Sequence, residues 1–473
     1  MDFWLDKEDV KVIFSEVGAL LGIIGLSLAV PIFVAQHYGE GEMARIFLWM
    51  LVLFAGPGML MHRRLKTDRQ LMLKHAAIVA TIAWLIIPLM SVLPFVFNGI
   101  SLPDSLFETM SGWTATGLSM MPHPESLPRS LIFWRSYMQW VGGMGIITLA
   151  LSILRNPGAL KLYTSEGRNE NLKLSITGTA RSMWAIYLMY TIAGIGLVRI
   201  SGMPLFESIN HVMSAISTGG FSVTAASISG YNDGVKLALS LVMLFGGMSF
   251  VLHYDMLRGR AREALRSTEF RLYLAVILLA SLLIWSNMQA SAGPVDVLFQ
   301  TISSVTGTGF TSVDLGAWSE LSLFILILLM LFGPCAGSTG GAMKMWRMLL
   351  VFKSVYRELM RHLVPSSAVM QIKVNRTTID EKDLVKILCF VLLYLGLVVS
   401  GGLLLMWFGY GAFESMFLAA SAQGNVGIAT LAPDKWFAMG TGPKTVLMAL
   451  MWAGRIEIFP VLTLIRALIP RRD

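Results

Sequence analysis

The sequence is poor in charge and cysteine, and it lacks the motifs of common soluble enzymes. Only 14% of its 473 residues are charged, against roughly 25% in soluble globular chains. Cys335 and Cys389 lie in apolar stretches and provide neither a disulfide framework nor metal-ligand spacing. No HExxH, GxSxG or GxxxxGK[ST] motif occurs, so metalloprotease, serine-hydrolase and phosphate-loop chemistry are unsupported. These absences exclude an ordinary soluble protein, and we predict that the chain is not an enzyme.

Long apolar runs dominate instead. The mean hydropathy is +0.66, and apolar stretches of about 20 residues are long enough to cross a bilayer as helices. Ten such stretches cover residues 12–36, 43–61, 75–98, 131–154, 182–201, 236–254, 271–288, 321–352, 384–409 and 443–469. The predicted fold class is therefore an all-α polytopic membrane protein with about ten full spans.

The basic residues follow a membrane pattern, which accounts for the net charge of +8 without nucleic-acid binding. They gather in alternate loops, at 63–74, 155–181, 258–271 and 353–386, and again at the C-terminus. The positive-inside rule then places both termini in the cytoplasm. The basic loops also suit a docking face for a cytosolic partner, although topology signalling alone explains most of them.

A short segment recurs four times in the outer loops, at 104–119, 207–222, 296–311 and 414–429. Each copy has an acid thirteen residues, and a serine six residues, before a central glycine. The glycines are Gly117, Gly220, Gly309 and Gly427, the acids Asp104, Glu207, Asp296 and Glu414, and the serines Ser111, Ser214, Ser303 and Ser421. A second glycine site follows at Gly142–Gly143, Gly246–Gly247, Gly333 and Gly454. The alignment indicates an internal fourfold repeat.

Each repeat reads as a span, a re-entrant half-helix with a turn, and a second span. The predicted pore repeats are 75–154, 182–254, 271–352 and 384–469, and the two N-terminal spans at 1–61 lie outside them. About ten residues cannot cross a bilayer, so the half-helix must be buried in protein or face water. Its acid suits the positive end of the helix dipole, and helix capping is the alternative role for these acids.

The turn after each half-helix is the predicted ion site. Glycine permits backbone angles that let successive carbonyl groups face one axis, and four such turns would form a ring like a potassium filter. The predicted potassium-binding residues are Thr114, Ala115, Thr116, Gly117, Ser217, Thr218, Gly219, Gly220, Thr306, Gly307, Thr308, Gly309, Gly424, Asn425, Val426 and Gly427. They include no carboxylate, which favours a monovalent over a divalent cation. A single turn of this kind could equally be an ordinary loop between helices.

Two features beneath the turns indicate a gate. Gly337, Ser338, Thr339, Gly340 and Gly341 interrupt the span at 321–352, and small residues are poor material for a straight helix. We predict an intramembrane loop that plugs the path below the filter and moves to open it. The alternative is close packing of helices through small residues.

Arg455 is a charge within a span, and such residues usually face a cavity. A pore role for Arg455 competes with pairing to Glu457 or to carbonyl groups. Lys344 and Arg347 follow the loop and suit either the inner mouth or ordinary topology signalling.

With these motifs the chain resembles the Trk/Ktr/HKT superfamily, in particular the membrane subunit of bacterial Trk potassium uptake systems. The stretches 333–347 and 452–460 and the two extra N-terminal spans share that resemblance. It implies four channel-like units around one pore, a homodimer, and a cytosolic nucleotide-binding ring of the TrkA type. Some sodium-selective relatives have serine at the first filter glycine, so Gly117 favours potassium. The fourth turn, GNVGI, departs from the hydroxyl-rich pattern.

The predicted function is potassium uptake across the bacterial cytoplasmic (inner) membrane, driven by the membrane potential. A monovalent cation gains about 2.3 kcal/mol per 100 mV on entry. Potassium is the transported ion, lipid surrounds the chain, and no nucleotide is expected on it. A proton- or sodium-coupled symporter is the alternative, but it would call for mid-span carboxylates and inverted repeats, whereas mid-span acids are scarce here and the repeats run parallel.

Overall fold

The structure is a computed structural model that describes residues 5–153, 161, 175–288, 293–365, 370–374 and 377–469. Several basic residues of the predicted loops lie outside these ranges, namely Arg155, Arg168, Lys173, Arg376, Arg471 and Arg472. In the described part the chain is helical apart from its loops and one antiparallel strand pair, β1 (Lys373–Val374) with β2 (Thr377–Thr378). The predicted all-α class is confirmed.

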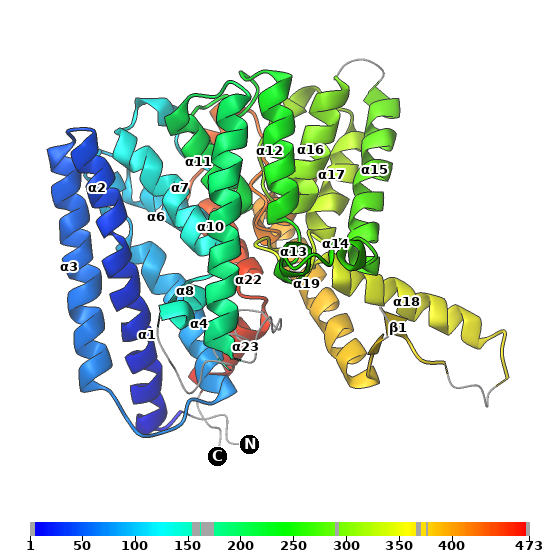
Figure 1. Ribbon diagram of the computed structural model, residues 1–473, viewed down its shortest axis with the longest axis horizontal. Coiled ribbons are helices and arrows are strands. Elements are labelled where there is room, and N and C mark those ends of the chain that lie inside the picture. The colour runs from blue at the N-terminus through cyan, green and yellow to red at the C-terminus, as the bar shows by residue number, and fades with distance from the viewer. Residues whose placement is uncertain are drawn as a thin grey trace.

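Three N-terminal helices stand at one side of the molecule (Figure 1). They are α1 (Lys7–Ser27), α2 (Ala29–His37) and α3 (Gly41–Arg64). Helices α1 and α3 touch through glycines, and a Cβ added at Gly18 would lie 2.6 Å from the carbonyl oxygen of Gly58. Small residues at this crossing let the two backbones approach as membrane helices commonly do.

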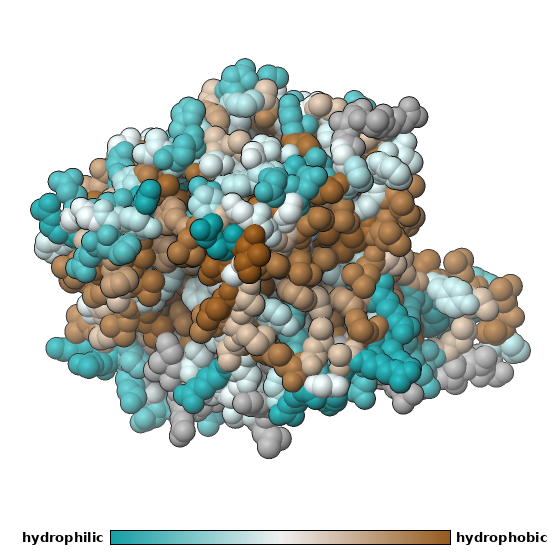
Figure 2. All heavy atoms as spheres, turned by 45° about the horizontal axis from the view of Figure 1, so that its top comes forward, coloured by the Kyte–Doolittle hydropathy of each residue, from teal (hydrophilic) through white to brown (hydrophobic). Residues whose placement is uncertain are grey.

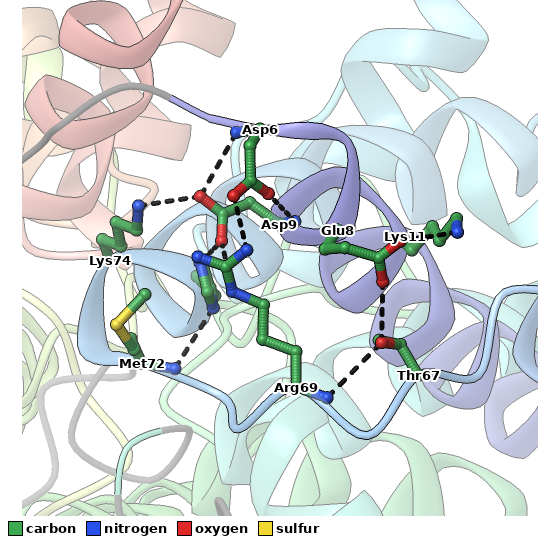
Figure 3. Close-up of polar contacts among 9 residues, drawn as sticks. Asp6, Glu8, Asp9, Lys11, Thr67, Arg69, Met72 and Lys74 are labelled. Carbon is green, nitrogen blue, oxygen red and sulfur yellow. Dashed lines mark hydrogen bonds and ion pairs between the residues drawn. The ribbon is translucent and has the colours of Figure 1, made fainter.

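A polar cluster fastens α1 to the first repeat (Figure 3). Asp9 is 1% exposed, and its carboxylate lies 3.0 Å from Arg69 Nε and 2.8 Å from Lys74 Nζ. The ring of His75 approaches the same carboxylate at 2.8 Å. Asp6 caps α1 by accepting a 2.7 Å hydrogen bond from the Asp9 N–H. These contacts bind the N-terminal helices to the loop before α4 and to α4 itself.

Four units with a shared plan follow: a first helix, a short helix, and a second helix that is broken. The first helices are α4 (Leu73–Met90), α10 (Ile176–Ile200), α15 (Thr268–Met288) and α19 (Glu381–Trp407). The short helices are α6 (Leu102–Trp113), α11 (Leu205–Ile216), α16 (Pro294–Thr306) and α20 (Ala412–Gln423). The second helices are α7 (Arg129–Met144) with α8 (Ile146–Ile153), α12 (Asp233–Gly246) with α13 (Phe250–Leu257), α17 (Glu320–Phe332) with α18 (Met345–Arg361), and α22 (Thr441–Arg455) with α23 (Phe459–Leu468).

Minor elements connect these helices on the two faces of the molecule. They are α5 (Leu93–Val96), the 3₁₀ turns η1 (Pro124–Ser126) and η2 (Leu315–Ala317), α14 (Ala261–Ala264) and α21 (Pro433–Phe437). The short helices have 12 or 13 residues. At 1.5 Å per residue each spans roughly 20 Å, which is less than a bilayer. Figure 1 places α6, α11 and α16 in its upper half.

The breaks in the second helices differ from the prediction. Among the described residues six helices are long and apolar enough to span a membrane singly, and two bent pairs, α12–α13 at 101° and α22–α23 at 110°, raise this to eight. We predicted continuous spans at 131–154, 236–254 and 443–469, whereas only the break within 321–352 was expected. Hydropathy reports apolar content but not backbone angles, such as the positive φ of 98° at Gly145 that separates α7 from α8.

Apolar side chains cover the middle of the surface. Figure 2 shows a hydrophobic band between more hydrophilic rims. Large apolar residues of the first helices are exposed, including Leu278 at 63% on α15 and Leu392 at 71% on α19. A soluble protein rarely exposes such continuous apolar surface, so this band is a lipid-facing surface. The chain is a multi-pass membrane protein.

Candidate functional site

The four predicted turns share one backbone conformation. The residue two positions before each filter glycine has a left-handed φ, at Ala115 (51°), Thr218 (54°), Gly307 (77°) and Asn425 (52°). The filter glycines follow with φ of 95° at Gly117, 80° at Gly220, 81° at Gly309 and 92° at Gly427. The residue between the two has a negative φ in every turn, an alternation that allows successive carbonyl groups to face one side. Four segments far apart in sequence therefore present the same row of main-chain oxygens.

The turns meet in chain order around one centre. A Cβ added at a filter glycine would collide with the carbonyl oxygen of the residue before the glycine in the next turn. The pairs are Gly117 with Gly219, Gly220 with Thr308, Gly309 with Val426, and Gly427 with Thr116. The fourth turn returns to the first, so the ring closes. Positive φ and lack of space both restrict these four positions to glycine.

The repeated serine holds each turn against its short helix. Its main-chain carbonyl accepts a hydrogen bond from the N–H of the residue before the filter glycine in all four turns. These bonds join Thr116 to Ser111 at 2.9 Å, Gly219 to Ser214 at 2.8 Å, Thr308 to Ser303 at 2.9 Å and Val426 to Ser421 at 2.9 Å. The hydroxyls of Ser111 and Ser421 also accept from the filter glycine N–H groups, at 3.0 and 3.1 Å. The sequence singled out these serines without a role, and turn support is that role.

A glutamine that the sequence analysis missed supports the second turn. Gln139 on α7 is fully buried, and its Nε2 donates to the Gly219 carbonyl at 2.6 Å. Its Oε1 accepts from the N–H of Phe221 at 3.0 Å and from the hydroxyl of Ser214. Gln139 stands three residues before Gly142, where the other second helices have Met243, Met330 and Met451. A single polar residue, at a position where the other three units have methionine, is the sequence signal that could have identified it.

The fourth turn uses its side chain differently from the first and third. Thr114 and Thr116 pair through their hydroxyls at 2.7 Å, and Thr306 and Thr308 do so at 2.8 Å. Asn425 instead extends to the first turn, donating from Nδ2 to Thr116 Oγ1 at 3.0 Å. The same Nδ2 donates to the Met451 carbonyl at 2.8 Å. The departure noted in the sequence is thus a bridge between the fourth and first turns.

The outer acids are occupied by partners rather than facing open water alone. Asp104 pairs with Lys444 of the fourth unit, and Asp296 lies 2.7 Å from Lys236 of the second unit. Glu207 accepts from the Tyr231 hydroxyl at 2.7 Å. The two ion pairs link neighbouring units at the outer end, and the Glu207–Tyr231 hydrogen bond lies within the second unit. The two buried lysines were not predicted, because the positive-inside rule assigns lysine and arginine to the opposite face.

The predicted loop lies directly beneath the ring, between α17 and α18. The Thr339 hydroxyl lies 3.0 Å from the carbonyl oxygens of Ile216 and Gly246. A Cβ added at Gly340 would lie 2.8 Å from the Thr306 carbonyl, and one at Gly341 equally close to that of Gly424. The loop thus touches the second, third and fourth units, and no side chain larger than hydrogen fits at its two contact glycines.

The end of the loop is strained. Ala342 and Lys344 have φ of 61° and 68°, and Glu457 and Ile458 at the α22–α23 break have 59° and 58°. Left-handed residues other than glycine cost of order 1 kcal/mol or more each, and they gather at switch segments. Both breaks therefore carry backbone strain at the same depth of the fold.

Arg455 contacts the loop and the first unit together. Its guanidinium donates to the Thr339 carbonyl at 2.8 Å and to the carbonyls of Gly142 and Gly143 at 2.5 and 2.7 Å. Glu457 instead contacts Arg347 at 2.5 Å and Lys344 at 3.3 Å. Of the two pairings considered for Arg455, the main-chain carbonyls are the hydrogen-bond partners.

The second glycine site lets the broken helices pack under the short ones. A Cβ at Gly246 would lie 2.7 Å from the Ile216 carbonyl at the end of α11. At Gly142 it would collide with the Trp113 carbonyl, and at Gly454 with that of Gln423. Glycine here brings the second helix of each of these three units against the C-terminal end of its short helix.

Cavities lie on both sides of the ring. An outer cavity of about 200 Å³ is lined by all four filter glycines. Below the ring, a space of about 30 Å³ is enclosed by residues 338–342, Trp84 and Arg455. A larger cavity of about 580 Å³ opens further below, beside Glu269, Gly337 and Arg347. The loop therefore lines the small space beneath the ring and, through Gly337, also borders the larger cavity.

The chemistry of the site rests on neutral oxygens. Within the described residues no group of three His, Cys, Asp or Glu side chains is arranged to hold a metal ion. A closed ring of main-chain carbonyls between an outer cavity and a loop-filled constriction, set in a band of lipid-facing helices, defines a membrane transport protein with a four-unit centre.

Comparisons with known proteins agree with this class. The TrkH family, described as cation transport proteins, matches residues 42–290 and 267–472. An uncharacterised cation transporter of Methanocaldococcus jannaschii is 34% identical over 98% of this chain and 97% of its own length. The Trk system potassium uptake protein TrkH of Escherichia coli is 30% identical over 95% and 96%. The chain belongs to the TrkH family of cation transport proteins.

A solved structure shares the whole architecture. The crystal structure of the potassium transporter TrkH from Vibrio parahaemolyticus superposes with a TM-score of 0.85 at 28% identity. The match covers 98% of this chain and 99% of that one. The resemblance drawn from the filter turns is therefore confirmed over the full length.

Proposed function

We propose that this chain takes up potassium through the ring of four turns. The observation that carries the proposal is the closed order of the ring, in which each filter glycine faces a carbonyl of the next turn. Such oxygens replace the hydration shell of a monovalent ion. Relatives of this chain from Escherichia coli and other bacteria are named potassium uptake proteins. Glycine at position 117 supports potassium over sodium.

Passage needs no chemical energy on this chain. A cation that crosses to the negative side gains about 2.3 kcal/mol per 100 mV. Neutral ligands bind it weakly enough for release, because they offer partial rather than full charges. The proposed mechanism is channel-like conduction across the cytoplasmic membrane, with both termini in the cytoplasm.

In this proposal the loop at 333–344 is the gate, and Arg455 holds it in the closed position. Two lines of geometry support it: the loop contacts three units beneath the ring, and Arg455 joins Thr339 to Gly142 and Gly143. The positive charge of Arg455 also repels cations at this depth. Opening would require these hydrogen bonds to break and the loop to leave the axis.

A homodimer and a cytosolic nucleotide-binding ring of the TrkA type complete the proposal. Their support is the family resemblance together with the basic loops on one face. A partner that pulls on α18, which begins at Met345 directly after the loop, would act on the gate through the chain itself.

Rubidium flux into liposomes tests the proposal. Gly117→Val and Gly309→Val should each reduce flux by about 100-fold or more, because the added side chain displaces a ring carbonyl. The matched control is Gly396→Val on α19, where a Cβ meets no heavy atom within 4 Å among the described residues. Unchanged flux and selectivity in both ring variants would refute the filter.

A further inference from the structure

Polar side chains of the short helices support the outer end of the filter at one repeated position. We call the contact between such a side chain and the segment after the filter glycine a brace. Nine residues before the filter glycines stand Glu108, His211, Gln300 and Leu418. Two residues after the same glycines stand Ser119, Ser222, Thr311 and Ala429. In the first two units the structure joins these positions directly. The first two short helices thus reach past their own turns to the segments that leave them.

The first brace carries full charges. The Ser119 hydroxyl lies 3.0 and 3.1 Å from the two carboxylate oxygens of Glu108, and the Met120 N–H donates to Glu108 at 3.0 Å. Arg135 on α7 pairs with the same carboxylate at 2.7 Å, and both side chains are buried. Removing one partner of a buried pair is strongly destabilising, because it leaves an uncompensated charge.

Arg135 extends the first brace to the second turn. Its Nη2 donates to Ser119 Oγ at 2.9 Å, and its Nη1 donates to the Ser222 carbonyl at 2.9 Å. The guanidinium also stacks over the Phe221 ring at 4.3 Å. One arginine therefore fixes the segments that follow Gly117 and Gly220 relative to each other.

The second brace is neutral. His211 is fully buried, and its Nδ1 lies 3.0 Å from the Glu207 carbonyl, which only accepts. The proton of this hydrogen bond is then on Nδ1, and Nε2 lies 3.0 Å from the Ser222 hydroxyl. The His211 ring also meets Phe310 edge-on at 5.6 Å. As in the first unit, the brace packs against the residue after the next filter glycine.

The hydrogen bonding at these paired positions decreases from the first unit to the fourth. Gln300 is fully buried, and neither of its amide atoms has a hydrogen-bond partner in the described part of the chain. In the fourth unit both positions are apolar, with Leu418 opposite Ala429. The series runs from an ion pair through a neutral hydrogen bond and an unbonded amide to a purely apolar pair.

We propose that these paired positions are positioning residues for ion selectivity, with the first unit contributing most. The inference rests on the proposed function. A ring of carbonyls discriminates against sodium only if it resists contracting around the smaller ion. The braces tie the outer segments of the first and second turns to rigid helices, so they oppose that contraction on one side of the ring.

The test removes a brace without leaving a buried charge. Ser119→Ala and Ser222→Ala keep the Glu108–Arg135 pair and His211 in place. Loss of one buried hydrogen bond changes an equilibrium about fivefold. Ser119→Ala loses at least two, the bond to Glu108 and the bond from Arg135 Nη2. The ratio of rubidium uptake to sodium uptake in liposomes should fall about fivefold or more in Ser119→Ala and about threefold in Ser222→Ala. Ser119→Thr, which retains the hydroxyl, should restore the ratio.

The fourth unit provides the matched control. Leu418→Met alters the same position without polar loss and should leave the ratio within about twofold of the unaltered protein. Melting temperatures of the purified proteins separate positioning from folding. An unchanged ratio in both alanine variants, with the unaltered protein selective, would overturn the braces alone. Absence of rubidium flux in the unaltered protein would overturn the proposed function beneath them.

Discussion

The ring and the loop beneath it are built on opposite principles. The ring is made four times from the same backbone angles, and each filter glycine approaches a main-chain carbonyl of the next turn. The loop occurs once, breaks the pattern of the other units, and is held by a charged side chain. Repetition fixes a geometry that must not move, since each turn supports the next. A single strained segment held by a few hydrogen bonds can leave its place at modest cost.

Arg455→Gln gives the largest expected effect at the loop. The variant loses the charged hydrogen bonds to Thr339, Gly142 and Gly143, each worth about 1.5–3 kcal/mol. We expect rubidium flux without any partner protein to rise at least tenfold. Arg466→Gln on the last helix, far along α23, is the matched charge control. A drop in flux with intact folding would show that Arg455 assists conduction instead of closing the path.

Thr339→Val should have a smaller effect in the same direction. Valine keeps the shape of threonine but loses the hydroxyl hydrogen bonds to the Ile216 and Gly246 carbonyls. One or two neutral bonds at about 1 kcal/mol each predict a rise in flux of about fivefold to thirtyfold. Thr339→Ser retains the hydroxyl and should behave like the unaltered protein. Equal flux in all three would mean that the loop is held by packing alone.

The same contrast between the ring and the loop explains how much of the site was predictable from the sequence. Fourfold alignment located the four turns that meet in the ring, because repetition multiplies a weak signal at Gly117 and its equivalents. The loop was found through its run of small residues at 337–341. The breaks at Gly145 and at Glu457–Ile458 were not, since a backbone reversal leaves no compositional trace.

Partners of the site were harder to foresee. Gln139, Lys236, Lys444 and Arg135 lie on second helices, and each joins a short helix or turn distant in sequence. Such contacts are set by tertiary packing, which one sequence does not reveal. The signal in each case was a polar residue in an apolar helix, and it gained meaning only when the fold placed its partner.

Lys236→Met tests the outer rim of the ring, with a moderate expected effect. Lys236 is 7% exposed and pairs with Asp296, tying the second unit to the third. Its loss leaves a carboxylate at the N-terminus of α16, where the helix dipole still favours negative charge. We expect a melting temperature several degrees lower and flux within about threefold. Lys435→Met on α21, at the exposed surface, is the control.

The smallest effect on transport is expected where the N-terminal helices attach. Asp9→Asn removes the charge that faces Arg69, Lys74 and His75, yet the cluster is far along the chain from the four turns. The variant removes the buried carboxylate that pairs with Arg69 and Lys74, so the protein should melt earlier, as after loss of one buried ion-pair member. Rubidium flux and the rubidium-to-sodium ratio should stay within about twofold, measured on the same liposomes. A selective loss of flux, with the melting temperature unchanged, would mean that the N-terminal helices take part in conduction, and the contrast between one fixed ring and one movable loop would no longer describe the whole molecule.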